Sequence, residues 1–319
     1  MSNSPSVQTA DISELRRRCE SLAQWAYTDF EQARAAIAEL EQSVGPQTPF
    51  DIRLAYHRHR AFLENQWRQF DLALEHFSKA LAILESLAEP LALAECWLDI
   101  SAVQLNRRDW PAVQHCLDRA RRYLKKDEAP HLRGLLACRE GFLHLHLGNL
   151  RQALDSLQES EHILLGLGER ATLKDCYVLS LVISGLGDLY ERLDEKDNSL
   201  DAYLRVLPLV EQHQLRPRLP WHYLNAGRAA LAQNDAGHAR ECFENVLQFA
   251  DEEEPEAKAH ALANLGILAL LDQDSARAIA LFDDATAQFP NPSKPADFTN
   301  LSKIQAWRAE LLLQLDDPG

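Results

Sequence analysis

Apolar residues recur at intervals of three and four positions along most of the chain. They form pairs such as Leu72-Ala73, Ala80-Leu81 and Ile83-Leu84. This interval places side chains on one face of an α-helix, whereas a half-buried strand would alternate at two. No Val- and Ile-rich alternating run predicts a strand anywhere in the sequence. The pattern therefore predicts an all-α protein.

Small residues return at a period of about 40 residues. Gly, Ala or Ser occupies eight positions separated by 40, 40, 40, 46, 40, 39 and 40 residues. This small-residue series consists of Ser21, Ala61, Ser101, Gly141, Gly187, Gly227, Gly266 and Ala306. A repeat at a fixed period of this length is typical of solenoid proteins.

Two further series run parallel to the first. Twelve residues downstream stands a second, mostly small series: Ala33, Ala73, Val113, Ala153, Ser199, Ala239 and Ala278. Four residues later stands a bulky series: Ile37, Phe77, Leu117, Leu157, Tyr203, Phe243 and Phe282. Small residues on two antiparallel helices let their backbones approach closely, and a bulky residue fills the space towards the next pair. The three series together predict about seven helical hairpins.

Polar and proline-containing breaks separate these helices. Gly148-Asn149, Asp194-Glu195 and Asn234-Asp235 suit the turn inside a hairpin. Prolines that favour breaks between hairpins are Pro46, Pro90, Pro130, Pro217, Pro220, Pro255 and Pro290. Pro111 suits the first turn of a helix. Pro208 falls late in a second helix, and we expect an early end or a kink there.

The motifs Leu186-Gly187-x-x-Tyr190, Gly141…Gly148 followed by Ala153, and Phe70-Asp71-x-Ala73-x-x-x-Phe77-x-x-Ala80 resemble tetratricopeptide repeats. The resemblance implies an α-solenoid, a right-handed superhelix of about seven hairpins with a capping helix at 297–315. We expect disorder at 1–9 and a single domain over 10–319. Its repeats are expected at 10–45, 50–88, 90–128, 130–168, 170–215, 217–254 and 255–290. The period of 40 exceeds the usual 34 and is similar to the sensory arrays of bacterial regulators.

The resemblance further implies that the first helix of each hairpin lines the concave face of the superhelix. The residues expected to contact a partner there are Arg58, Phe62, Asn65, Asn106, Phe142, His146, Asp188, Arg192, Asn225, Arg228 and Asn264. Asn225 and Asn264 both stand two residues before a glycine of the small-residue series. A ladder of amides can hold a peptide backbone, although each Asn could instead bond a neighbouring loop.

Arginines at these positions indicate an acidic or carboxylate-bearing ligand. Arg192 and Arg228 lie in consecutive repeats, with Arg58 further along. Pairing with the nearby Asp188 or Glu191 is an equally good interpretation.

Net charge disfavours two classes of partner. The 319-residue chain carries a formal charge of −15, and affinity for nucleic acid or anionic membrane depends on clustered Lys and Arg. Short basic runs such as Arg16-Arg17-Arg18 are interpreted as solvated helix faces. We therefore expect neither nucleic acid nor membrane as a partner.

Localisation is predicted from two further features. The six cysteines are scattered without a CxxC spacing, as in a reducing compartment. No secretory signal and no apolar run of about 18 residues is evident. A cytoplasmic protein is the prediction.

The sequence offers little for catalysis or metal binding. His57 and His59, like His144 and His146, are two residues apart, which places each pair on different faces of a helix. Neither a phosphate-binding loop nor a nucleophile motif is found. We therefore expect no metal, no cofactor and no enzyme. The prediction is a module that binds a peptide or helical segment of a partner protein. The alternative is a sensory or regulatory subunit whose groove binds a small ligand or signal peptide and controls a partner. The oligomeric state stays open.

Overall fold

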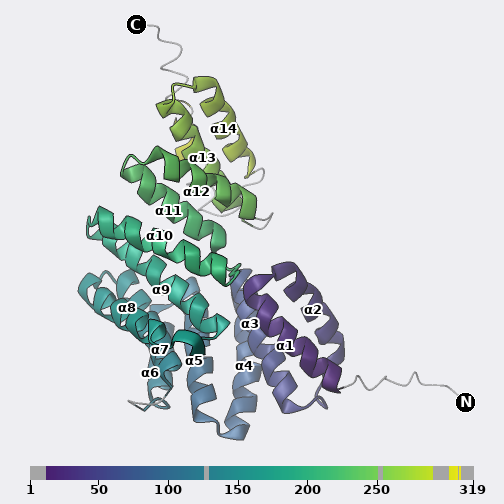
Figure 1. Cartoon of the computed structure of the whole chain (residues 1–319). Coiled ribbons are helices and arrows are strands. Elements are labelled where there is room, and N and C mark those ends of the chain that lie inside the picture. Colours follow the sequence, from purple (N-terminus) through teal and green to yellow (C-terminus); the bar gives the residue numbers. More distant parts are fainter. Residues whose placement is uncertain (1–11, 126–128, 251–253, 290–301, 308, 310–319) are drawn as a thin grey trace, which may run out of the picture. The chain divides into compact units, whose positions relative to one another are not determined.

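The computed structural model describes residues 12–125, 129–250, 254–289, 302–307 and 309. Its helices pair as α1 (Ile12–Thr28) with α2 (Phe30–Ser43), α3 (Phe50–Gln66) with α4 (Phe70–Leu87), α5 (Pro90–Arg107) with α6 (Trp110–Arg121), and α7 (Pro130–His146) with α8 (Leu150–Leu165). A 3-10 turn, η1 (Gly168–Arg170), precedes α9 (Leu173–Arg192) and α10 (Lys196–Gln212). The series ends with α11 (Leu219–Ala232), α12 (Ala236–Phe249), α13 (Pro255–Leu271) and α14 (Ser275–Ala287) (Figure 1). Each pair lies within one predicted repeat, and no strand occurs in the described ranges, so the all-α solenoid of about seven hairpins is confirmed.

Contacts divide the described residues into two compact units. Unit 1 contains α1 to α8, α9 as far as Leu189, and the segment Leu209–Pro217. Unit 2 contains Tyr190–Pro208 and the chain from Arg218 onwards, with α11 to α14. Whether the chain unfolds as a single domain stays a prediction.

One turn geometry closes six of the hairpins. A residue in the left-handed region stands seven positions after each small-series residue from Ala61 to Gly266. These residues are Arg68, Arg108, Gly148, Asp194, Asn234 and Gln273. The next amide returns to the helix, as in Gln69 N to Glu64 O at 2.8 Å. This Schellman-type bonding satisfies the last carbonyls of the first helix.

The second helix of a hairpin often begins with a capping aspartate. Asp109, Asp235 and Asp274 each accept a hydrogen bond from the amide three residues later. Such caps satisfy amides that have no partner within the helix. The polar breaks seen in the sequence thus serve to end one helix and start the next within three residues.

Prolines begin the first helices. Pro90, Pro130, Pro220 and Pro255 occupy the first turns of α5, α7, α11 and α13, and Pro111 that of α6. A missing N–H costs nothing there. Pro208 differs from expectation, because α10 continues through it to Gln212 rather than ending early.

The predicted series form the core. All members of the second and bulky series are buried, with Phe243 and Phe282 at 0 % exposure. In the small series, the six residues from Ala61 to Gly266 are buried as well.

The two ends of the small series depart from the prediction. Ser21 is half-buried, because the buried stripe of α1 runs through Leu15, Cys19, Leu22 and Ala26 and so passes beside it. Ala306 is exposed; in that segment Ile304 is the buried residue, at 2 % exposure.

Part of the predicted capping helix can be compared with the structure. Residues 302–307 and 309 are helical, and Ile304 joins a core with Ala259 and Ala263 of α13. The rest of 297–315 lies outside the described residues, as do residues 1–9.

Each bulky residue lies over the small residue of its own hairpin. A Cβ on Gly227 would stand 2.6 Å from Phe243 Cε1, and one on Gly266 would stand 2.8 Å from Phe282 Cε1. Phe243 also shares a core with Ala257, Ala261 and Leu265 of the following hairpin, as the sequence predicted. The ring therefore packs where a side chain on the first helix would otherwise stand.

Gly227→Leu tests this packing. The new side chain would overlap the Phe243 ring, so we expect a loss of at least about 3 kcal/mol of unfolding free energy, measured by urea denaturation. Gly237→Leu, on the exposed first turn of α12 where a Cβ meets only Asp235 Oδ1 at 3.7 Å, should change stability by less than about 0.5 kcal/mol. Equal effects at the two glycines would contradict the packing described.

Candidate functional site

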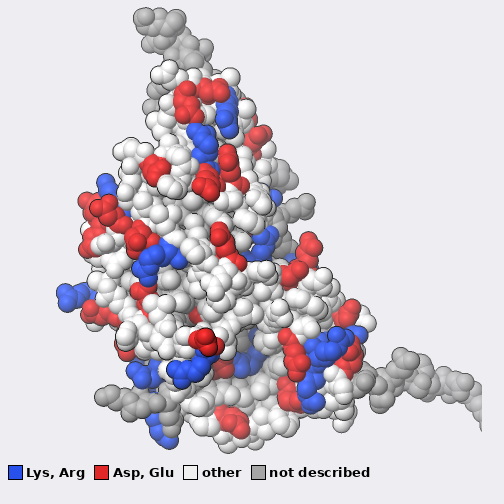
Figure 2. Space-filling model, viewed as in Figure 1, with Lys and Arg blue, Asp and Glu red and all other residues white. Residues whose placement is uncertain are grey.

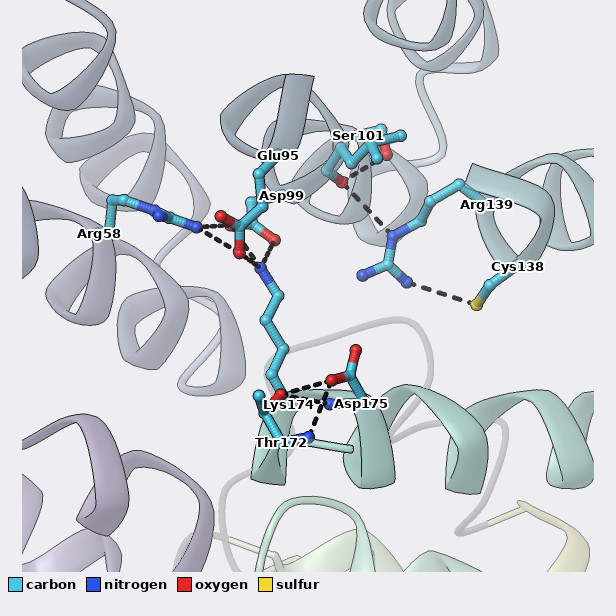
Figure 3. A network of polar contacts seen from close by, with 10 residues as sticks. Arg58, Glu95, Asp99, Ser101, Cys138, Arg139, Thr172, Lys174 and Asp175 are labelled. Atoms are coloured by element: carbon cyan, nitrogen blue, oxygen red, sulfur yellow. Dashed lines mark hydrogen bonds and ion pairs between the residues drawn. The ribbon is translucent and has the colours of Figure 1, made fainter. Parts of the chain in front are cut away.

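Four charged side chains meet between α3, α5 and α9 of unit 1 (Figure 3). Lys174 Nζ lies 2.8 Å from Glu95 Oε1 and 2.6 Å from Asp99 Oδ1. Arg58 Nη2 lies 2.7 Å from the same Glu95 oxygen and 3.2 Å from Asp99 Oδ2. Two cations and two carboxylates thus form one network, with Lys174 contributed from a helix 75 residues or more away in sequence.

Burial strengthens these ion pairs. The four side chains are between 15 % and 23 % exposed, so water screens them only in part. Burial by itself would raise the pKa of Glu95, but Lys174 and Arg58 outweigh it and hold that pKa well below its usual value. The network therefore stays ionised at neutral pH and holds the start of α9 against α5.

An aromatic cluster continues the same contact. Phe62 of α3 packs against Tyr27 of α1 and Tyr177 of α9, with ring centroids 4.8 Å and 5.6 Å apart. Gln66 Nε2 donates to the Tyr177 hydroxyl at 3.2 Å. The Arg216 amide donates to the Tyr27 carbonyl at 2.7 Å. The first half of α9 and the segment after α10 thus cover a face of α1, α3 and α5 that the sequence assigned to a partner.

Sequence reasoning missed Glu95, Lys174 and Tyr177, although one signal was available. Residues 176–186 contain no charged side chain, and a helix that is apolar on all sides is buried on all sides. In the structure, six successive residues, Asp175 to Ser180, are indeed buried. That run indicates a second packing surface but not which helices provide it.

Asn65 and Asn106 form the next contact along the predicted face. Asn106 Nδ2 donates to Asn65 Oδ1 at 3.0 Å, and Asn65 is only 6 % exposed. The structure therefore brings together Arg58, Phe62, Asn65 and Asn106 in neighbouring first helices, each in contact with side chains of the chain itself. Their contact with a partner stays a prediction.

The predicted residues of α7 and α9 are more scattered. The Phe142 ring packs on α9, 2.9 Å from where a Cβ on Gly185 would stand. His146 is exposed and stacks on Trp110, with centroids 5.0 Å apart. Asp188 is half-buried and Arg192 is exposed.

Unit 2 presents two parallel stripes on adjacent first helices. α11 carries Trp221, Asn225 and Arg228, and α13 carries His260, Asn264, Ile267 and Leu271. Their spacings of four and three residues place each set on one helix face. The helices are in contact, and the Trp221 and His260 rings lie 6.4 Å apart. All seven side chains are partly or largely exposed, Leu271 to 64 %.

Local bonds of these residues are weak or confined to their own helix. Asn264 Nδ2 donates to the His260 carbonyl at 2.7 Å, rather than to a loop. Arg228 lies 3.5 Å from Glu191 in an exposed pair, as the alternative interpretation proposed. Exposed pairs contribute little to stability, so Arg228 can exchange Glu191 for another anion.

Charged surface residues occur in mixed groups. On the face seen in Figure 2, basic side chains lie in small groups next to acidic ones. The basic run at 16–18 is an example: Arg16 pairs with Asp51, and Arg18 with Glu14 and Glu39. The run is thus a solvated helix face, as predicted.

Histidines and cysteines give no metal or nucleophile site within the described ranges. No group of three metal-binding side chains occurs there. His57 and His76 share a hydrogen bond between their Nδ1 atoms at 2.9 Å, and burial lowers the pKa of each to about 4. The six cysteines are buried and free, and burial raises the pKa of Cys96 and Cys116 to about 12, which keeps those thiols protonated.

No protein-family model matches the sequence, and no curated protein matches it. Solved structures do. A Rap protein complexed with competence and sporulation factor superposes with a TM-score of 0.62 at 13 % identity, over 99 % of this chain and 89 % of that one. A signal transduction ATPase from Pyrococcus horikoshii with a tetratricopeptide repeat sensor gives 0.60 at 13 % identity, over 97 % of this chain and 49 % of the other. This chain has the tetratricopeptide-repeat fold.

A further similar structure concerns catalysis. Aspartyl phosphate phosphatase F from Bacillus subtilis has a TM-score of 0.52 at 12 % identity, over 98 % of this chain and 95 % of that one. At such identities the likeness extends to the fold alone, and the fold does not by itself decide between binding and catalysis. In the described part of the chain, no helix is long and apolar enough to cross a membrane.

A double-mutant cycle tests the ionic contact of α9. Lys174→Met leaves two half-buried carboxylates with one cation, so we expect a loss of about 1–3 kcal/mol of unfolding free energy. Combined with Glu95→Gln, the two changes should couple by about 1–2 kcal/mol. Lys79→Met, which removes an exposed pair with Glu75, should cost less than about 0.5 kcal/mol. Additive effects of Lys174→Met and Glu95→Gln would contradict the network.

Proposed function

We propose that this chain is a non-enzymatic interaction module that binds a peptide or helical segment of a partner protein. The proposal places the segment along α11 and α13 of unit 2. It rests on one observation: the two exposed stripes stand in the same register, with Asn225 of α11 matched by Asn264 of α13, 39 residues later.

Matched amides suit an extended backbone. An asparagine side chain both donates and accepts, so two of them on adjacent helices can bond successive peptide groups with little regard to side-chain identity. Asn264 Nδ2 is bonded to its own helix, which leaves the oxygen as the acceptor it offers to a partner. Asn225 is half-buried, so its amide is held at the surface without being enclosed.

The neighbouring side chains indicate the chemistry of the segment. Trp221 at one end and Ile267 with Leu271 at the other supply apolar surface. Arg228 lies between them, and His260 has its pKa lowered by burial and by the nearby Arg228 and Lys303. This face is therefore locally cationic on an acidic chain, which favours a segment that combines apolar anchors with an acidic residue.

Unit 2 is favoured over unit 1 because of what already covers the first helices. In unit 1, α9 occupies the face of α1, α3 and α5 through the ionic network and the aromatic cluster. The solved Rap structure, which contains a bound factor, supports binding as a use of this fold.

The regulatory alternative has support of its own. The repeats of the Pyrococcus horikoshii protein are described as a sensor, and here α9 contacts helices far away in sequence, so a ligand that displaced it would change the arrangement of unit 1. A change in small-angle X-ray scattering on addition of a small molecule, without any protein partner, would favour this alternative.

The paired amides provide the test of the binding proposal. Asn225→Ala with Asn264→Ala should weaken binding about tenfold or more, since each lost hydrogen bond contributes about 1 kcal/mol. The measurement is calorimetric titration with the partner protein recovered by co-purification from the native cells. Circular dichroism should show unchanged helicity.

Asn245→Ala, a half-buried asparagine on the second helix α12, is the matched control and should leave the affinity unchanged. If the double variant binds as tightly as the wild type, α11 and α13 are not the binding face. If no stoichiometric protein partner is recovered, the interaction role itself is wrong.

A further inference from the structure

Arg139 of α7 is a buried cation without a carboxylate. Its side chain is 6 % exposed, and no other Lys or Arg in the described residues is buried to this degree. Nε donates to the Leu98 carbonyl at a long 3.4 Å, and Nη1 lies 3.9 Å from Cys138 Sγ. Neither contact carries a negative charge, and a thiol is a weak acceptor.

The neighbouring ionic groups are already satisfied. Arg58 and Lys174 share Glu95 and Asp99. The Asp175 carboxylate accepts from Thr172 N at 2.9 Å and Thr172 Oγ1 at 2.7 Å, at the positive end of α9. Figure 3 shows Arg139 beside this network with no dashed line to any of its carboxylates. Its charge is therefore the one left uncompensated in this part of unit 1.

Such a charge cannot be relieved by losing a proton. A buried lysine can become neutral, but a guanidinium stays ionised in proteins. A buried ion without a counter-ion is strongly unfavourable. An arginine placed this way is explained when an anion from outside the chain joins it.

A molecule from solution can reach the guanidinium. The fully enclosed side-chain nitrogens without a partner in the described residues include Arg58 Nε and Trp97 Nε1, but no nitrogen of Arg139. Nη2 has no bonding partner there and is not sealed off, so it is free to donate to an incoming acceptor.

We infer that Arg139 binds the carboxylate of a ligand that enters unit 1 between α5 and α7. The planar guanidinium fork matches the two oxygens of a carboxylate. Glu95, Asp99 and Asp175 lie on the neighbouring helices α5 and α9, and they disfavour a doubly charged anion such as phosphate. A single negative charge balances Arg139 alone.

The position of Arg139 in the repeat supports a role in binding. It stands two residues before Gly141, the place that Asn225 and Asn264 hold before Gly227 and Gly266. The carboxylate site lies in unit 1 and does not depend on peptide binding by unit 2, so either can fail without the other.

The test compares the full-length wild type with Arg139→Met and with Arg133→Met, a half-buried arginine of the same helix. Melting temperatures are measured in sodium acetate, sodium phosphate or sodium chloride at equal ionic strength. A second arm uses acetyl-trialanine with a free carboxylate and the same peptide with a C-terminal amide.

Wild type and Arg133→Met should melt several degrees higher with the free-acid peptide, with acetate, or with both, than in chloride. Arg139→Met should lose this shift, and its calorimetric affinity for the stabilising acid should fall at least tenfold. A shift with the peptide acid alone identifies a peptide C-terminus as the source of the carboxylate. A shift with acetate as well identifies any small carboxylate.

Stability without added anion separates binding from a structural role. Removal of an uncompensated buried charge should leave the melting temperature of Arg139→Met equal to or above that of the wild type. A fall of several degrees would mean that the contacts with Leu98 and Cys138 already satisfy the arginine, and the inference would be wrong. Stabilisation by phosphate alone, or by no anion beyond chloride, would also overturn it.

Discussion

Close approach of the two helices in each hairpin is the constraint on which the rest of this structure depends. A residue with little or no side chain on the first helix lets a bulky residue of the second helix lie directly over its backbone, as Phe243 does over Gly227. The same ring also joins the core shared with the next hairpin. Helix pairing and repeat stacking are therefore coupled through single residues, and this coupling fixes which face of every first helix stays outside the core.

The faces left outside the core have different fates in the two units. In unit 1, α9 returns to the face of α1, α3 and α5, where Lys174 completes an ionic network and Tyr177 completes an aromatic cluster. In unit 2, the corresponding faces of α11 and α13 remain partly exposed. A repeated architecture thus supplies similar positions many times, while the side chains at those positions decide whether the chain itself or another molecule occupies them.

Charge distribution reinforces this distinction. The chain as a whole is acidic, yet the cations Arg58 and Lys174 are matched within the network, whereas Arg228 has only an exposed and long contact with Glu191. Arg139 is buried without any carboxylate. An acidic protein that keeps cations weakly matched at particular places is suited to select anionic groups there, because its remaining surface repels them.

The sequence by itself determined the helices, their pairing and nearly all of the core, because these depend on residues close in sequence and on a period that repeats seven times. It misplaced Ser21 and Ala306, where terminal helices lack a neighbour on one side and the buried stripe shifts. It also could not show that Phe62 meets Tyr177 or that Lys174 meets Asp99. Those contacts join residues 75 or more positions apart, and they arise from how successive hairpins stack, a small rotation per repeat that no local pattern encodes. Only the tertiary structure therefore decided which predicted binding residues are already in contact with the chain itself.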